Sequence, residues 1–188
     1  MKRFPTVLLA LSLLVAAAAA AQTAPRGEKK AAPKKPAKVA ARAADPEVID
    51  ATGFAELLAK QRGKRVMVNF WATWCEPCRE EFPMVNELAQ KYAAQGLVVL
   101  GVSLDDDGEL TMVRRFLGRV NPVFRNYRKK PGNEEAFINA IDRKWSGAIP
   151  ATFFYAPDGR RVGTLVGEHK REEFEKAIQE LLARPAPR

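Results

Sequence analysis

The chain contains two cysteines, Cys75 and Cys78, and only Glu76 and Pro77 separate them. Two thiols at this spacing form a chemical pair rather than the framework of a disulfide-stapled scaffold. Such a pair can perform thiol–disulfide exchange, in which a thiolate attacks a disulfide and forms a mixed-disulfide intermediate. The spacing therefore suggests a redox-active pair, and the expected helix start at this motif makes Cys75 the attacking thiolate and Cys78 the resolving thiol.

Two elements must position this pair. Residues 65–71 (RVMVNFW) are β-branched, aromatic and mostly apolar, which predicts a buried central strand. A helix is expected to begin at the cysteines and to end at about Gln95, before Gly96. The N–H groups and partial positive charge of a helix N-terminus favour a thiolate and can lower a cysteine pKa from about 8.5 to roughly 3.5–7.5. We expect Cys75 at an exposed tip and Cys78 one turn inside.

Two other interpretations of the cysteines are weaker. A structural zinc site normally needs four ligands, whereas this chain offers two cysteines and one distant histidine, His169. Two inert buried cysteines would not need a Trp-Cys-x-Pro-Cys sequence at a helix start. We therefore predict no metal site and no cofactor, and we assign His169 no role.

The remaining pattern predicts the order β-α-β-α-β-α-extension-β-β-α. Glycine and proline signals separate helical periodicities from apolar runs, and this alternation implies a sheet covered on both faces. A basic turn is expected at Arg128–Pro131. The other elements are expected as a short strand at 48–49, strands at 97–104, 151–155 and 161–166, an extended segment at 121–127, and helices at 53–61, 105–117, 134–141 and 170–182.

The N-terminal part differs from the rest in composition. Lys2 and Arg3 precede an apolar run that ends in alanines, a pattern typical of a secretory signal peptide over 1–21, or of an anchor if it is not cleaved. Residues 22–46 are rich in Ala, Lys and Pro and lack aromatic side chains, so we expect a flexible linker. Residues 1–46 hold nine basic and two acidic residues. The remainder has 22 basic and 20 acidic residues, a net of +2, which argues against a nucleic-acid-binding domain.

Residues 69–83 (NFWATWCEPCREEFP) resemble the active-site stretch of the thioredoxin superfamily. They are most similar to its exported bacterial members, the thiol-disulfide oxidoreductases of TlpA/ResA type, and the resemblance covers about residues 48–183. It implies an α/β, thioredoxin-like fold over 47–184, with a central mixed β-sheet and helices on both faces.

The resemblance also implies a substrate-binding surface. Ile149 and Pro150 are similar to the family's cis-proline loop, which would place Pro150 beside Cys75 and let the Ile149 backbone pair with a substrate strand. An ordinary proline at the start of a strand is the alternative. We assign Trp74 and Pro77 to the same surface.

Glu81 lies three residues after Cys78 and resembles an acid that ResA-type reductases keep near their thiols. The spacing places both side chains on one helix face. A buried carboxylate has a raised pKa and can transfer protons, so we expect a catalytic role, although a solvated outer-face glutamate is the alternative. Asn69 stands where cytoplasmic thioredoxins carry a buried aspartate.

Two segments depart from a minimal thioredoxin or invite another interpretation. Residues 118–147 are longer than that fold needs, and Trp145 there is either a core residue or a determinant of partner choice. Asp105, Asp106 and Asp107 lack the spaced ligands of a calcium loop, so carboxylates at a helix N-terminus are the simpler interpretation.

Three functions are compatible with these features. The first is a periplasmic, monomeric reductase of disulfides in exported proteins, for instance in cytochrome c maturation, supplied with electrons by a membrane-embedded donor. The second is a disulfide-introducing oxidase, for which residues 118–147 are too short to hold the usual large helical insertion. The third is a thiol-based copper-binding module, which the lack of a Met/His cluster argues against.

Overall fold

The computed structural model describes residues 45–185. The predicted signal peptide (1–21) lies outside the described residues, and so does the predicted linker (22–46) except for its last two residues. None of the helices in the described range is long and apolar enough to cross a membrane.

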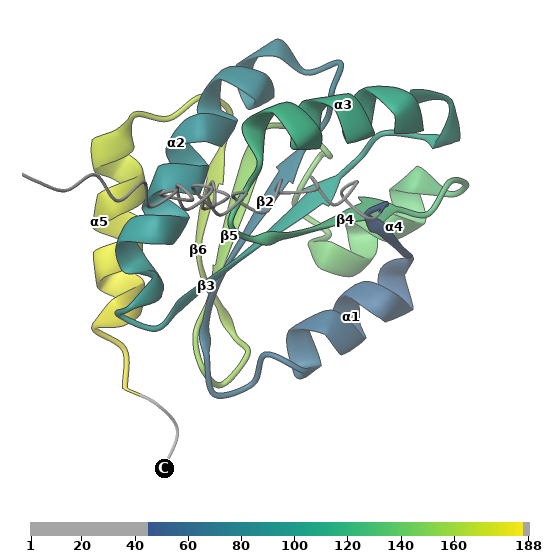
Figure 1. The fold of residues 1–188 in the computed structure, drawn as a ribbon. Coiled ribbons are helices and arrows are strands. Elements are labelled where there is room, and N and C mark those ends of the chain that lie inside the picture. Colours follow the sequence, from purple (N-terminus) through teal and green to yellow (C-terminus); the bar gives the residue numbers. More distant parts are fainter. Residues whose placement is uncertain (1–44, 186–188) are drawn as a thin grey trace, which may run out of the picture. The chain divides into compact units, whose positions relative to one another are not determined.

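Within this range, six strands form one mixed sheet in the order β1-β4-β3-β2-β5-β6 (Figure 1). The first four strands of that order run parallel, and β5 and β6 are antiparallel to their neighbours. This confirms the predicted α/β fold with a central mixed sheet. The strands are β1 (Glu47–Ile49), β2 (Arg65–Trp71), β3 (Leu97–Ser103), β4 (Arg125–Lys129), β5 (Ala151–Tyr155) and β6 (Arg161–Val166).

Helices cover both faces of the sheet. Alternate residues of each strand point to opposite faces, and apolar side chains on both faces need to be buried. In β2, Val66, Val68 and Phe70 pack against one helical layer, which contains α1 and α4. Met67 and Trp71 pack on the other face, against α2, α3 and α5. The helices are α1 (Ala51–Ala59), α2 (Glu76–Ala93), α3 (Leu110–Val120), α4 (Glu134–Ile141) and α5 (Arg171–Leu182), and a short 3-10 turn, η1 (Asp107–Glu109), precedes α3.

Side-chain caps explain where two of the predicted helices begin. The carboxylate of Asp50 accepts a hydrogen bond from Gly53 N (2.9 Å) at the start of α1. The amide oxygen of Asn133 accepts one from Ala136 N (2.9 Å) at the start of α4. Each cap satisfies a backbone donor that the first helical turn leaves without a partner.

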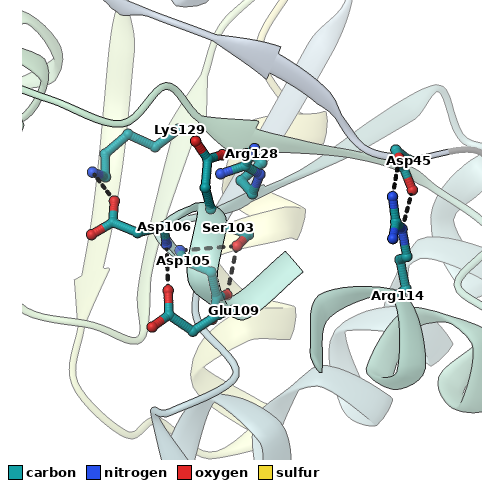
Figure 2. Close-up of polar contacts among 9 residues, drawn as sticks. Asp45, Ser103, Asp105, Asp106, Glu109, Arg114, Arg128 and Lys129 are labelled. Carbon is teal, nitrogen blue, oxygen red and sulfur yellow. Dashed lines mark hydrogen bonds and ion pairs between the residues drawn. The ribbon is translucent and has the colours of Figure 1, made fainter. Parts of the chain in front are cut away.

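The basic turn predicted at Arg128–Pro131 was wrong for its first two residues, and only Lys130 and Pro131 lie in the bend after β4. Arg128 and Lys129 belong to β4, which is shifted toward the C-terminus relative to the extended segment expected at 121–127, and both are buried. Their charges are tolerated there because acidic residues after β3 reach them: Lys129 pairs with Asp106 (3.2 Å) and Arg128 with Asp107 (2.6 Å). Figure 2 shows Lys129 directed at Asp106 beside the end of β3. A run of basic residues predicts a solvent-exposed turn, but here the acidic partners lie in the segment that follows β3.

Trp145 is a core residue, which decides between the two alternatives for it. Only 5% of the residue is exposed, and its ring lies 4.9 Å from that of Phe70 and 5.3 Å from that of Phe153, measured between ring centroids. Its indole N–H donates to the carbonyl oxygen of Ala148 (2.9 Å). Part of the segment 118–147 therefore completes the hydrophobic layer under α1 and α4.

Replacing Trp145 with alanine should lower the free energy of unfolding by about 3–5 kcal/mol, because the cavity lies in a packed aromatic cluster. Urea denaturation of the oxidised protein measures this change. Trp74→Ala is the matched control, since Trp74 is 59% exposed and its loss should change stability by less than about 0.5 kcal/mol. Equal losses in the two variants would contradict the placement of Trp145 in the core.

Candidate active site

The two cysteines lie where β2 passes into α2. Strand β2 is buried along almost its whole length, and Ala72, Thr73 and Trp74 connect it to the helix. Cys75 is the N-cap of α2, and Pro77 occupies the first turn, where no intrahelical amide donor is needed. Strand β2 therefore positions the N-terminus of α2, whose unpaired N–H groups lie next to the cysteines.

Cys75 and Cys78 form a disulfide. Cys75 Sγ also accepts a hydrogen bond from the backbone N–H of Cys78 (3.3 Å). The same donor can stabilise a thiolate on Cys75 after reduction, and the positive end of the helix dipole adds to that effect. The arrangement is thus suited to holding a negative charge on the first sulfur of the pair.

Cys75 is less exposed than we expected. In the disulfide form only 6% of Cys75 and 2% of Cys78 are accessible to solvent, whereas the neighbouring Trp74 is 59% exposed. The reason is that both cysteines pack against a cluster of aromatic side chains. In this cluster the ring centroid of Trp71 lies 4.9 Å from those of Phe82 and Phe116. Cys75 therefore lies just below the surface beside the exposed indole of Trp74 and does not project into solvent.

A buried carboxylate holds the connection between β2 and α2. Asp105 is fully buried at the end of β3, next to Ser103 in Figure 2. It accepts hydrogen bonds from the Thr73 backbone N–H (3.0 and 3.1 Å to its two oxygens), the Thr73 hydroxyl and the Ser103 hydroxyl (2.6 Å). We expected the three aspartates to serve together at a helix N-terminus, but Asp105 instead anchors the segment before Cys75.

Glu81 lies three residues after Cys78 in α2, a spacing that puts both side chains on one face of the helix. Its Oε1 accepts a hydrogen bond from Asn69 Nδ2 (3.1 Å), and the same nitrogen donates to Thr152 Oγ1 (2.9 Å). Asn69 is 2% exposed. Glu81 is thus partly buried and connected to β2 and β5, in contrast to the exposed Glu80 next to it.

Burial raises the pKa of Glu81 to about 7. The hydrogen bond from Asn69 and the nearby His169 oppose this rise, and Glu168 adds to it. We had assigned His169 no role, yet the turn between β6 and α5 brings it within electrostatic range of Glu81. No sequence spacing signalled this, because His169 is 88 residues away in the chain.

The Ile149–Pro150 peptide bond is cis, as the resemblance implied. Pro150 is buried and its carbonyl oxygen accepts from Gly167 N (2.8 Å). The next residue, Ala151, pairs with Phe70 near the end of β2, and Ile149 packs against the cluster that contains both cysteines. The loop therefore lies at the same end of β2 as the disulfide.

Replacing Glu81 with glutamine should flatten the dependence of stability on pH. The folded protein binds a proton on Glu81 more tightly than the unfolded chain, so this contribution is complete below pH 4.5 and is lost as pH rises through about 7. The full effect is roughly 3 kcal/mol.

Urea denaturation between pH 4 and 8 measures this difference, with the disulfide intact. Glu80→Gln, a change at an exposed neighbour, is the matched control. If Glu81→Gln and the parent protein show parallel stability curves, the Glu81 carboxyl is not protonated near neutral pH.

A family match and several curated relatives point to the same class of protein. Residues 39–160 match the AhpC/TSA family. The thiol-disulfide oxidoreductase ResA of Bacillus cereus is 31% identical over 134 residues, which cover 71% of this chain and 73% of that protein. ResA of Geobacillus kaustophilus is 31% identical over 144 residues, covering 76% and 78%.

Solved structures agree with this assignment. A putative thiol:disulfide interchange protein DsbE from Chlorobium tepidum aligns with a TM-score of 0.58 and 29% identity, over 67% of this chain and 85% of that one. A secreted disulfide oxidoreductase of Mycobacterium tuberculosis shares the fold at 20% identity, with a TM-score of 0.52 over 65% and 86% of the two chains. The chain therefore belongs to the AhpC/TSA family of the thioredoxin superfamily and is a thiol-disulfide oxidoreductase of ResA/DsbE type that carries the Cys75–Cys78 pair.

Proposed function

We propose that this oxidoreductase works in the periplasm as a reductase of disulfides in exported proteins, with Cys75 as nucleophile. The observation that carries the proposal is the Cys75–Cys78 disulfide at the N-terminus of α2, backed by the partly buried Glu81. The signal-like pattern of residues 1–21 supports export.

The reaction transfers two electrons from the protein to its substrate. The Cys75 thiolate attacks one sulfur of a substrate disulfide, which forms a mixed disulfide and releases the other sulfur as a thiolate. Cys78 then loses its proton and attacks Cys75 Sγ, which releases the second substrate sulfur and closes the Cys75–Cys78 disulfide. The two released substrate thiolates take up protons, and a membrane-embedded dithiol donor restores the reduced pair.

Glu81 is proposed to accept the proton of Cys78 in the second step. Its pKa of about 7 leaves both protonation states populated near neutral pH, which is the condition for efficient proton transfer. It lies about one helical turn beyond Cys78, and Asn69 holds its carboxylate in place.

Trp74, Pro77, Ile149 and Pro150 are proposed to bind the substrate polypeptide. Trp74 offers an exposed indole directly before Cys75. Ile149 forms no backbone hydrogen bond with any residue in 45–185, so its N–H and C=O can pair with an extended substrate segment. The cis-proline loop would then hold that segment across the sulfur of Cys75.

Cytochrome c maturation is one setting that fits this chemistry, since haem attachment requires reduced cysteines in an exported protein. The proposed enzyme acts as a monomer and needs no cofactor of its own.

A disulfide-introducing oxidase remains the second candidate, because the same cysteine pair can carry out exchange in either direction. Against it, residues 118–147 contain the end of α3, β4 and the eight-residue helix α4 rather than a large helical insertion.

A copper-binding module is the third candidate. Among residues 45–185, no group of three or more His, Cys, Asp or Glu side chains is arranged to hold a metal ion. A site built on the two thiols alone would compete with disulfide formation between them.

Two cysteine variants of the full chain test the proposed mechanism. Cys75→Ser should abolish exchange with a disulfide peptide, because the remaining thiol, Cys78, is buried and only 2% exposed. Cys78→Ser should complete the first step and accumulate a protein–peptide mixed disulfide, since nothing resolves it. Mass spectrometry under non-reducing conditions measures both outcomes. Full turnover in Cys75→Ser, or no mixed disulfide in Cys78→Ser, would contradict the assigned roles.

A further inference from the structure

A hollow of about 380 Å³ opens beside the active site, between the start of α2 and the exposed side of α3. Three of its lining side chains are arginines. It is lined by Thr73, Arg79, Met112, Arg115, Phe116 and Arg119. We refer to this site, defined by these six residues, as the arginine groove.

The arginines of the groove have no acidic partners in the described part of the chain. No carboxylate of residues 45–185 lies within ion-pair distance of Arg79, Arg115 or Arg119, although nine lysine or arginine side chains pair with carboxylates elsewhere in that range. Arg114, next to Arg115, does pair with an acid, Asp45. Figure 2 shows that pair.

The positions of these charges are unfavourable for the isolated protein. Arg115 and Arg119 are four residues apart in α3, so they lie on one helix face, where like charges repel. Arg119 also lies over the Phe116 ring (5.6 Å to the centroid). This contact holds the guanidinium at the groove and leaves its N–H donors without a carboxylate. Positive charges gathered in this way favour an anionic ligand.

The groove is continuous with the site of exchange. Arg79 Nη1 donates to the carbonyl oxygen of Thr73 (2.8 Å), two residues before Cys75, so both residues belong to the groove and to the active-site segment. Trp74 next to it is 59% exposed, and Met112 in the lining is 48% exposed. Tryptophan, methionine and arginine are the residue types enriched in protein–protein contacts.

We propose that the arginine groove binds an acidic segment of the polypeptide whose sulfur reacts with Cys75. This inference rests on the proposed function, because it names the substrate class of the same site. A polypeptide joined to Cys75 in the mixed disulfide must pass the active-site segment, and the adjoining groove is large enough for its side chains. Aspartate and glutamate side chains match guanidinium groups in charge and in paired hydrogen-bonding geometry.

Two disulfide peptides test the proposal with the full chain. They share one sequence around the disulfide and differ in a flanking run, which is acidic in one and consists of the corresponding amides in the other. At low ionic strength the reduced protein should react about tenfold faster with the acidic peptide, because steering by complementary charge raises the association rate. Salt should remove this preference as the screening length shortens.

Arg115→Gln combined with Arg119→Gln should abolish the preference for the acidic peptide. The matched control is Lys60→Gln combined with Lys64→Gln, which removes two exposed positive charges near the start of β2, at the opposite end of that strand from Cys75. This control should keep the preference. Retained preference in the arginine variant, or equal loss in both variants, would overturn the proposal.

The same comparison can be made with the oxidised protein and the dithiol forms of the two peptides. It measures whether the acidic peptide also reacts faster when electrons flow from peptide to protein. The groove is therefore tested even if the protein proves to be an oxidase and the proposed reductase function fails. A membrane surface with anionic lipids is the alternative ligand for the groove. Sedimentation with anionic phospholipid vesicles tests whether the groove binds such a surface. Vesicle binding that the arginine variant loses, without any peptide preference in the parent protein, would assign the groove to a membrane surface instead.

Discussion

The buried carboxylate of Asp105 is the interaction on which the active site depends. It joins the end of β3 to Thr73 through the backbone N–H and the hydroxyl of that residue, and so fixes the segment from which Cys75 follows. A buried carboxylate is costly unless its oxygens accept hydrogen bonds, and here Ser103 completes the set. The helix N-terminus that favours a thiolate is therefore held at the end of β2 by a contact between neighbouring strands.

The surroundings of the disulfide divide into an apolar side and a polar side. Trp71, Phe82 and Phe116 pack beneath the cysteines and exclude water, which explains why Cys75 is nearly buried beside the exposed Trp74. On the polar side, the hydrogen bond from Asn69 directs Glu81 while burial raises its pKa to about 7. This division fits the proposed roles, in which Cys75 reacts with the substrate and Glu81 accepts the proton of Cys78.

The sequence predicted the fold and the position of the cysteines well, because both depend on local patterns. The apolar run of β2, the helix start at Cys75 and the Asn133 cap of α4 are signals carried by adjacent residues. The errors concern contacts between distant segments. Arg128 and Lys129 looked solvated because their acidic partners belong to another strand end, and the influence of His169 on Glu81 arises only from the turn before α5. Charge pairing across the sheet leaves no periodic trace in a sequence.

The measurement that tests the account most directly is the equilibrium reduction potential of the Cys75–Cys78 pair against glutathione. Each change of about 30 mV in this two-electron couple alters the preference for one direction by about 1.4 kcal/mol. We predict a potential below about −220 mV, at which the protein is a reductant that needs an electron supply. A potential near about −120 mV would contradict it and make the protein a donor of disulfides.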